Sequence, residues 1–134
     1  MAPPLIAHVI FSFRMGGLEN GLVNIINRMD PERYRHAVVC LTDHDAFADR
    51  VERDDVPVID LHKRPGQDPG LHLRLWRTFR RLRPAIVHTR NFAALEAHLP
   101  ASLAGVRHHV HGEHGRDVFD LHYRNRKQRI ARKV

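Results

Sequence analysis

The stretch HGEHGRD, residues 111–117, gathers side chains that could carry chemistry. His111 and His114 can exchange protons near neutral pH, while Arg116 and Asp117 supply one charge of each sign. A general base also needs a pKa near the working pH and a partner, and the sequence shows neither. The histidines lie only three apart in a glycine-bearing loop with no cysteine pair, so we expect no metal. Arg116 and Asp117 either face the same cleft or form an ion pair that only orders the loop.

A second candidate is the glycine pair Gly16 and Gly17 in MGGLENG, which joins an apolar run to an amphipathic one. The spacing matches neither the GxGxxG of a dinucleotide site nor the GxxxxGK[ST] of a P-loop, so neither a nicotinamide cofactor nor ATP hydrolysis is indicated. The glycines let backbone amides approach a phosphate, or they merely permit a strand-to-helix turn. Glu19 falls in the first helical turn, where a carboxylate is favourable and a capping role competes with ligand contact.

The third candidate is HTRN, residues 88–91, which ends another apolar run. Arg90 either clamps an anionic group of a ligand or is an ordinary surface arginine. Asn91 is better explained as the cap of a following helix than as a ligand-binding residue. His108 and His109 lie inside a strand candidate, where we expect them to be packed or partly solvated.

These candidates follow short apolar runs that alternate with helical patterns. The sequence predicts strands at residues 5–13, 36–42, 57–61, 85–89 and 107–111, and helices at 18–29, 47–53, 69–82 and 91–105. The expected helix signals are Asp68 and Pro69 at the start of the third helix and Pro84 after it. For the fourth helix they are Asn91 as the cap, Pro100 as a kink or restart, and Gly105 as the end. Nearly continuous apolar strands joined by helices indicate an α/β fold, a Rossmann-like doubly wound parallel sheet with helices on both faces. Ligands of such sheets bind at the carboxyl ends of the strands.

Composition and charge narrow the class of protein. The 134 residues are 43% hydrophobic, enough for one domain, and Cys40 is expected to be a small buried hydrophobe in a reducing compartment. The chain shows no secretory leader and no apolar run of membrane-spanning length, which predicts a cytoplasmic protein. The net charge is +7, and segment 123–134 contributes six of these charges because it has six basic residues and no acid. Residues 1–122 are therefore nearly neutral. This distribution makes nucleic-acid binding a weak alternative.

The three motifs, taken in their order along the chain, resemble the N-terminal half of family 4 glycosyltransferases of the GT-B fold. The residues that carry the resemblance are GGLENGLVNIINRM, AIVHTRN and VHGEHGRD. The closest match that we suggest is the group of sugar transferases associated with exosortase and exopolysaccharide gene clusters. The resemblance runs from about residue 7 to the basic tail. It implies that 1–122 form the acceptor-side domain, that 123–134 are a basic helical tail, and that a C-terminal donor-binding domain is absent from this chain, which looks like a fragment.

The resemblance implies a retaining transfer of a sugar from a nucleotide-sugar donor to a glycan or lipid-linked acceptor, without a metal or other cofactor. It assigns Gly16 and Gly17 to the donor phosphates. His111 and His114 become catalytic candidates, through a hydrogen bond to a sugar hydroxyl or through stabilisation of oxocarbenium charge by the ring or backbone carbonyl. The acceptor-side candidates are Glu19, Arg90, Asn91, Arg116 and Asp117.

Other classes of protein remain as alternatives. A non-catalytic α/β binding module with a basic tail could bind an anionic membrane, peripherally at its inner face, or nucleic acid. A receiver domain is disfavoured, because it needs an acidic cluster after the first strand and an aspartate after the third, where this chain has Arg14 and HKR.

Overall fold

The computed structural model describes residues 2–90 and 97–112. Within these ranges the elements follow in the order β1 (Leu5–Ile10), α1 (Gly17–Arg28), β2 (Arg35–Cys40), the 3₁₀ helix η1 (Ala46–Arg50), β3 (Val58–Asp60), α2 (Gly70–Leu82), β4 (Ile86–Arg90), α4 (His98–Leu103) and β5 (His108–Gly112). Strands and helices alternate as the sequence predicts. Four of the five strands lie within two residues of their predicted bounds.

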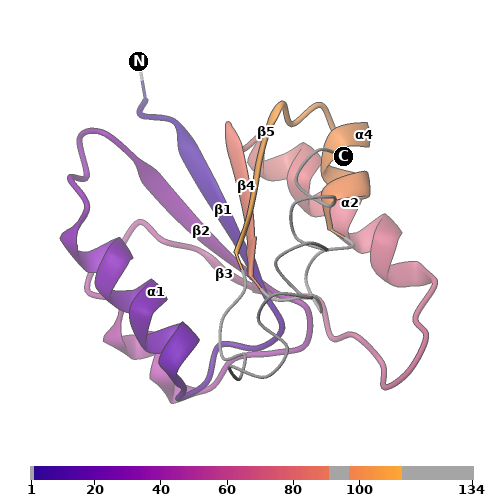
Figure 1. Cartoon of the computed structure of the whole chain (residues 1–134), viewed down its shortest axis with the longest axis horizontal. Coiled ribbons are helices and arrows are strands. Elements are labelled where there is room, and N and C mark those ends of the chain that lie inside the picture. The colour runs from indigo at the N-terminus through magenta and orange to yellow at the C-terminus, as the bar shows by residue number, and fades with distance from the viewer. Residues whose placement is uncertain (1, 91–96, 113–134) are drawn as a thin grey trace, which may run out of the picture.

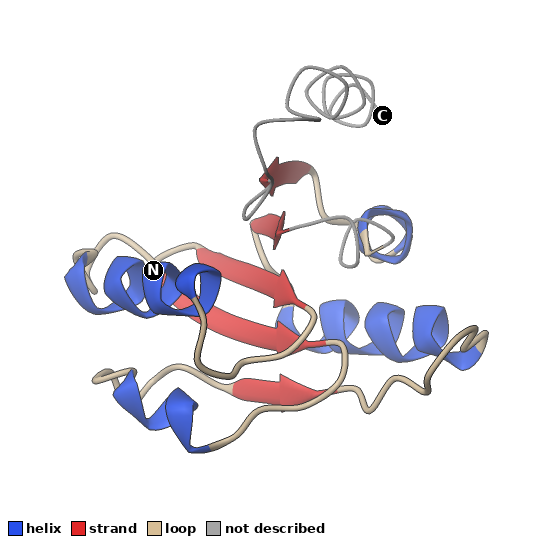
Figure 2. Ribbon diagram, turned by 60° about the horizontal axis from the view of Figure 1, so that its bottom comes forward, coloured by secondary structure: helices blue, strands red, loops and turns tan. Residues whose placement is uncertain are grey.

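The five strands form one parallel sheet in the order β3-β2-β1-β4-β5. β1 lies at the centre, where Val9 pairs with Val39 of β2 on one side and with Thr89 of β4 on the other. The chain moves outward through β2 and β3 and then returns across the centre to β4 and β5. Because parallel crossovers are right-handed, this reversal places the early helices on one face and the later helices on the other. Figures 1 and 2 show this layering, with α1 and α2 on opposite sides of the strands, and confirm the doubly wound α/β fold.

Each face of the sheet has its own hydrophobic core, because successive strand side chains point to opposite faces. The core on the α2 side contains Ala7, Val9, Val39, Leu41, Leu61, Leu71, Leu75, Phe79, Val87, Ala97, Ala101 and Val106. The core on the α1 side contains Ile10, Phe13, Leu22, Val23, Ile26, Val38, Cys40 and Phe47. The predicted apolar stripes of α1 and α2 therefore face the sheet. Cys40 is fully buried, as expected, and burial raises the pKa of its thiol to about 12.

Two boundary predictions are wrong. The first strand ends at Ile10, not at residue 13, yet Phe13 is fully buried and bridges His44 in parallel fashion. The apolar pattern continues past the strand because this loop also packs on the core. The predicted helix 47–53 is the short 3₁₀ helix Ala46–Arg50, begun by the carboxylate of Asp45, which accepts a hydrogen bond from Phe47 N–H at 2.9 Å.

The start of α2 also differs from prediction. Pro69 is the N-cap residue, and no side chain caps the helix. The carboxylate of Asp68 instead accepts hydrogen bonds from Arg64 N–H at 3.0 Å and Arg74 Nη2 at 2.6 Å, and these lower the pKa of Asp68 to about 2. Asp68 therefore ties the preceding loop to the helix. At the other end, Arg83 adopts a left-handed conformation with φ 50° directly before Pro84, the predicted stop.

α4 is the part of the predicted fourth helix that the structure describes. Pro100 lies in its first turn, where the missing proline N–H breaks no helical hydrogen bond. Gly105 follows the helix with φ 95°, a conformation that glycine adopts without strain, and this confirms the predicted end. The predicted start at Asn91 lies outside the described residues. None of the helices in the described ranges is long and apolar enough to cross a bilayer.

Candidate functional site

The candidate site lies at the carboxyl edge of the sheet, around the point where the strand order reverses. β1 and β4 are neighbours there, although their crossovers leave toward opposite faces. Such a reversal leaves a crevice between the two loops that follow the strands, and this is where doubly wound folds bind ligands. The loop after β1 carries Gly16 and Gly17, and β4 ends at Arg90. The topology thus brings two of the three predicted motifs to the same crevice.

The two glycines of the turn are not equivalent. Gly16 is the N-cap residue of α1 in an extended conformation, and a Cβ there would collide with the carboxylate of Glu19. Gly17 is the first residue of α1, is exposed, and would place a Cβ in open space. No side chain caps α1, so its first N–H groups are available to an anion, which the helix dipole also favours. Glu19 lies in the first turn, as predicted, against Gly16.

Arg90 is a buried cation. It is only 4% exposed, which shows that its interpretation as an ordinary surface arginine is wrong. Burial lowers the pKa of its guanidinium to about 10, so Arg90 stays charged at neutral pH. Within the described part of the chain its guanidinium hydrogen-bonds to a histidine, His8 Nδ1 at 3.0 Å, and forms no ion pair with a carboxylate. A buried charge without a counter-ion is costly, and an anionic ligand at this edge would compensate it.

His8 and His36 lie on the α1 side of the sheet and form a chain of hydrogen bonds that begins at Arg90. A guanidinium only donates hydrogen bonds, so His8 Nδ1 must accept, and its proton sits on Nε2. His8 Nε2 then donates to His36 Nδ1 at 2.9 Å, and the two rings are stacked with centroids 5.1 Å apart. Burial, followed by the charge of Arg90, lowers the pKa of His8 well below 6.5. Burial also lowers the pKa of His36 to about 4. Both rings are therefore neutral at physiological pH.

Thr89, the residue before Arg90, faces the opposite side of β4 and joins a second histidine network. His111 Nδ1 lies 2.6 Å from the Thr89 hydroxyl, and His98 Nε2 lies 2.7 Å from the same oxygen. His98 Nδ1 in turn lies 2.7 Å from His109 Nδ1, and His109 Nε2 lies 3.0 Å from the carbonyl of Val106. Burial lowers the pKa of His98 to about 4, so this ring is neutral.

The direction of these hydrogen bonds follows from the Val106 carbonyl, which can only accept. In the arrangement with one proton on each ring, His109 Nε2 donates to it, His98 Nδ1 donates to His109, and Thr89 donates to His98. The hydroxyl of Thr89 can then only accept from His111 Nδ1–H. This leaves the lone pair of His111 on Nε2. The His111 ring is 3% exposed, so it is held rigidly rather than projecting into solvent.

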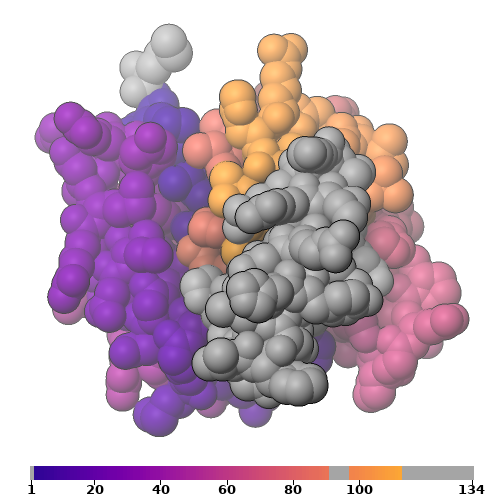
Figure 3. Space-filling model, viewed as in Figure 1, coloured from indigo at the N-terminus to yellow at the C-terminus, as the bar shows by residue number. Residues whose placement is uncertain are grey.

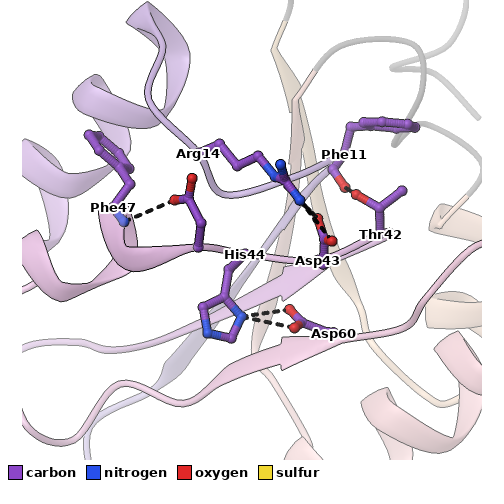
Figure 4. A network of polar contacts seen from close by, with 8 residues as sticks. Phe11, Arg14, Thr42, Asp43, His44, Phe47 and Asp60 are labelled. Atoms are coloured by element: carbon purple, nitrogen blue, oxygen red, sulfur yellow. Dashed lines mark hydrogen bonds and ion pairs between the residues drawn. The ribbon is translucent and has the colours of Figure 1, made fainter.

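On the other side of β1, polar contacts between side chains line the carboxyl ends of β2 and β3 (Figure 4). Arg14 donates three hydrogen bonds to the carboxylate of Asp43, two from Nη2 at 2.8 Å and one from Nε at 3.3 Å, and His44 Nδ1 lies 2.9 Å from both oxygens of Asp60. Thr42 donates to the Phe11 carbonyl at 2.8 Å. These groups are mutually satisfied, so they order the loops after β1, β2 and β3. Within the described ranges, no three His, Cys, Asp or Glu side chains are grouped to hold a metal ion.

The structure therefore places five of the predicted site residues, Gly16, Gly17, Glu19, Arg90 and His111. Asn91, His114, Arg116, Asp117 and the tail 123–134 lie outside the described residues. Sequence reasoning missed His8 and Thr89, which position Arg90 and His111. The signal for His8 was a polar residue inside an otherwise apolar first strand, LIAHVI.

Comparison with protein-family models finds that residues 15–134 match the model described as Glycosyltransferase Family 4. The match includes the glycine turn and the ends of β4 and β5. A search of curated proteins finds no match to the chain.

Proposed function

Because the chain belongs to glycosyltransferase family 4, we propose that it forms the acceptor-side domain of an enzyme that transfers a hexosyl group with retention of configuration. The donor is a nucleotide sugar, and the acceptor is a glycan or a lipid-linked glycan. Residues 1–122 form the domain, and the basic tail 123–134 leads toward a separate donor-binding domain. The enzyme acts in exopolysaccharide or cell-envelope synthesis, in the cytoplasm at the inner face of the membrane. The family match is the observation that supports this proposal most strongly.

The turn before α1 is proposed to receive the donor diphosphate. Gly17 is exposed and has open space beside its α-carbon, so a phosphate can approach the backbone amides there. Gly16 leaves room for the Glu19 carboxylate, which keeps that side chain folded back on the turn. The positive end of the α1 dipole offsets part of the diphosphate charge, and the proposal requires no metal.

Arg90 is proposed to hold an anionic group across the crevice. Its charge is buried and, among the described residues, has only a neutral imidazole as partner. With Arg90, the proposed acceptor-side residues are Glu19, Asn91, Arg116 and Asp117.

His111 is proposed to act on the transferred sugar, with His114 as the other candidate. The Thr89 hydroxyl accepts a hydrogen bond from His111 Nδ1–H, which leaves the lone pair of the ring on the buried Nε2 atom. That lone pair, or the backbone carbonyl of His111, can accept a hydrogen bond from a sugar hydroxyl or stabilise positive charge that develops during transfer. Thr89 fixes the tautomer and the ring orientation, which is the preorganisation that such a role needs.

The proposal is tested by titrating the 134-residue chain with UDP, GDP, ADP and inorganic pyrophosphate in a calorimeter. Gly17→Val should weaken the binding of the preferred diphosphate at least tenfold, a loss of about 1.4 kcal/mol. Gly21→Val is the matched control, because Gly21 lies in the same helix and also has open space beside its α-carbon. Equal weakening by Gly17→Val and Gly21→Val would contradict a phosphate site at the helix start.

Sugar transfer itself should require more than this domain. Donor, acceptor and catalytic groups must be held together for the barrier to fall. We therefore expect no turnover from the 134-residue chain in an assay with radiolabelled nucleotide sugars. Turnover by the chain alone would refute the assignment of the donor site to a separate domain.

A further inference from the structure

The charges of the domain are divided between its two sides. Residues 2–68 contain eleven Asp and Glu against eight Lys and Arg, whereas the described residues from 69 onward contain seven arginines and no acid. The folded chain separates these parts in space. In Figures 1 and 3 the purple N-terminal half lies on one side and the pink and orange segments of α2 and α4 lie on the other. Five of these seven arginines, Arg77, Arg80, Arg81, Arg83 and Arg107, are exposed, so this side of the described structure is basic.

The basic side also exposes large apolar side chains. α2 and α4 pack side by side, and their outer surfaces carry Leu73 (49% exposed), Trp76 (36%), Leu99 (64%) and Leu103 (70%). Leu99 and Leu103 are one helical turn apart and therefore share a face of α4. The exposed arginines Arg77, Arg80 and Arg81 lie on the same helix as Leu73 and Trp76.

A pocket with two arginines opens between the ends of these helices. Its volume is about 280 Å³, and its lining is Arg80, Arg83, Pro84, Ala104, Gly105 and Val106. Neither arginine has an ion-pair partner within the part of the chain that the structure describes. Arg80 also stacks over the ring of Trp76, 5.8 Å from its centroid, so the pocket adjoins this partly exposed aromatic side chain. This pocket lies at the amino ends of β4 and β5, away from the candidate catalytic edge.

We propose that the α2–α4 surface docks on an anionic lipid bilayer and that the Arg80–Arg83 pocket receives a lipid phosphate headgroup. The charge of the surface is complementary to anionic lipid, and two arginines form a suitable fork for phosphate oxygens. Trp76, Leu99 and Leu103 would lie in the interfacial layer, where aromatic and aliphatic side chains gain by leaving water. A nucleic acid would also be complementary in charge, but it would not explain why the apolar side chains of Leu99 and Leu103 are exposed on this surface. The proposal does not depend on the transferase activity.

The experiment is co-sedimentation of the 134-residue chain with vesicles of phosphatidylcholine alone or of equal parts phosphatidylcholine and phosphatidylglycerol. We expect pelleting with the anionic vesicles at low salt, and strong weakening near 1 M salt, where the Debye length is about 3 Å. The test variant is Arg80→Gln/Arg83→Asn, in which asparagine suits the left-handed backbone of residue 83. Each basic residue near an anionic surface is worth about fivefold, so we expect about 30-fold weaker partition for the pair.

Arg28→Gln/Arg33→Asn is the matched control, because it removes the same charge from exposed positions on the opposite half of the domain. It should partition like the wild type. Leu99→Ser/Leu103→Ser should weaken partition without changing net charge, which purely electrostatic attraction would not do. Circular dichroism confirms that each variant is folded.

Three outcomes would overturn the proposal. Equal partition of the pocket variant and its control would show that no specific surface is used. Loss of binding on Arg129→Gln/Arg132→Gln, with the pocket variant unaffected, would assign the membrane contact to the tail. Tighter binding to a duplex oligonucleotide than to anionic vesicles, measured by fluorescence anisotropy and weakened in the pocket variant, would assign the surface to nucleic acid.

Discussion

Acidification to pH 5 should destabilise the folded domain through His8 and His36. Both rings are buried, at 2% and 0% exposure, and the hydrogen bonds from Arg90 to His8 and from His8 to His36 require them to be neutral. The pKa of His8 lies well below 6.5 in the folded state and that of His36 is about 4, with Arg53 and Arg90 adding to the effect of burial and Asp55 opposing it at His36. The unfolded chain therefore binds more protons below pH 6.5, and stability falls as the pH falls.

The expected loss of unfolding free energy follows from the difference between pH 5 and the pKa of 6.5 that histidine has in the unfolded chain. Keeping one imidazole neutral 1.5 pH units below that value costs about 2 kcal/mol, so the pair costs about 4 kcal/mol. A chain of this length has a free energy of unfolding of about 7–20 kcal/mol. His98, whose pKa is also lowered to about 4, adds a further cost of about 2 kcal/mol by the same reasoning. Acidification to pH 5 therefore removes a large fraction of the free energy of unfolding.

The assay is urea unfolding at a series of pH values between 4.5 and 7.5, where most carboxylates remain ionised. The three protons taken up on unfolding, by His8, His36 and His98, give a slope of about 4 kcal/mol per pH unit near pH 5. His36→Asn should lower this slope by about a third, because the asparagine amide oxygen can still accept from His8 Nε2 but does not titrate. His108→Gln removes an exposed histidine and should leave the slope unchanged.

The same pair can be observed directly by NMR titration of the histidine ring protons in the native state. A native His36 that titrates near pH 6.5, or an equal slope in wild type and His36→Asn, would refute the buried neutral pair.

Thr89→Val should lower the free energy of unfolding by about 1–3 kcal/mol, because it removes the hydroxyl that joins His98 to His111, and Thr89→Ser should restore most of the loss. A valine variant as stable as the wild type in urea would show that the hydroxyl does not organise the two rings. Gly105→Ala should destabilise the domain by about 1–2 kcal/mol, since φ 95° disfavours a side chain, whereas Gly21→Ala in α1 should stabilise it by up to about 1 kcal/mol. Thermal unfolding that ranked these two alanine variants the other way would contradict the assigned backbone.

Much of the fold could be predicted because its signals are local. The stripes Leu22 and Ile26 of α1, and Leu75 and Phe79 of α2, repeat at helical spacing and do face the sheet. Boundaries failed where a loop is itself buried, as at Phe13, since an apolar residue then no longer marks a strand.

The site was predictable only in outline. The rule that ligands bind at strand ends led to Gly16, Gly17 and Arg90 without knowledge of their contacts. The partner of Arg90 lies 82 positions away in the chain at His8, and no local pattern links them. Such a pair depends on which strand lies beside which and in what register, and the sequence of either strand contains neither fact.

The central position of β1 has a consequence for how the chain folds. Val9 pairs with Val39 thirty positions later, but its other partner, Thr89, comes eighty positions later. At a synthesis rate of about 5–20 residues per second, that second partner emerges about 4–16 s after Val9. During this interval the innermost strand of the finished sheet is an edge strand, apolar on both faces, with unpaired amides and carbonyls along one side. The nascent chain is therefore most exposed to aggregation at the strand that is best protected in the native domain.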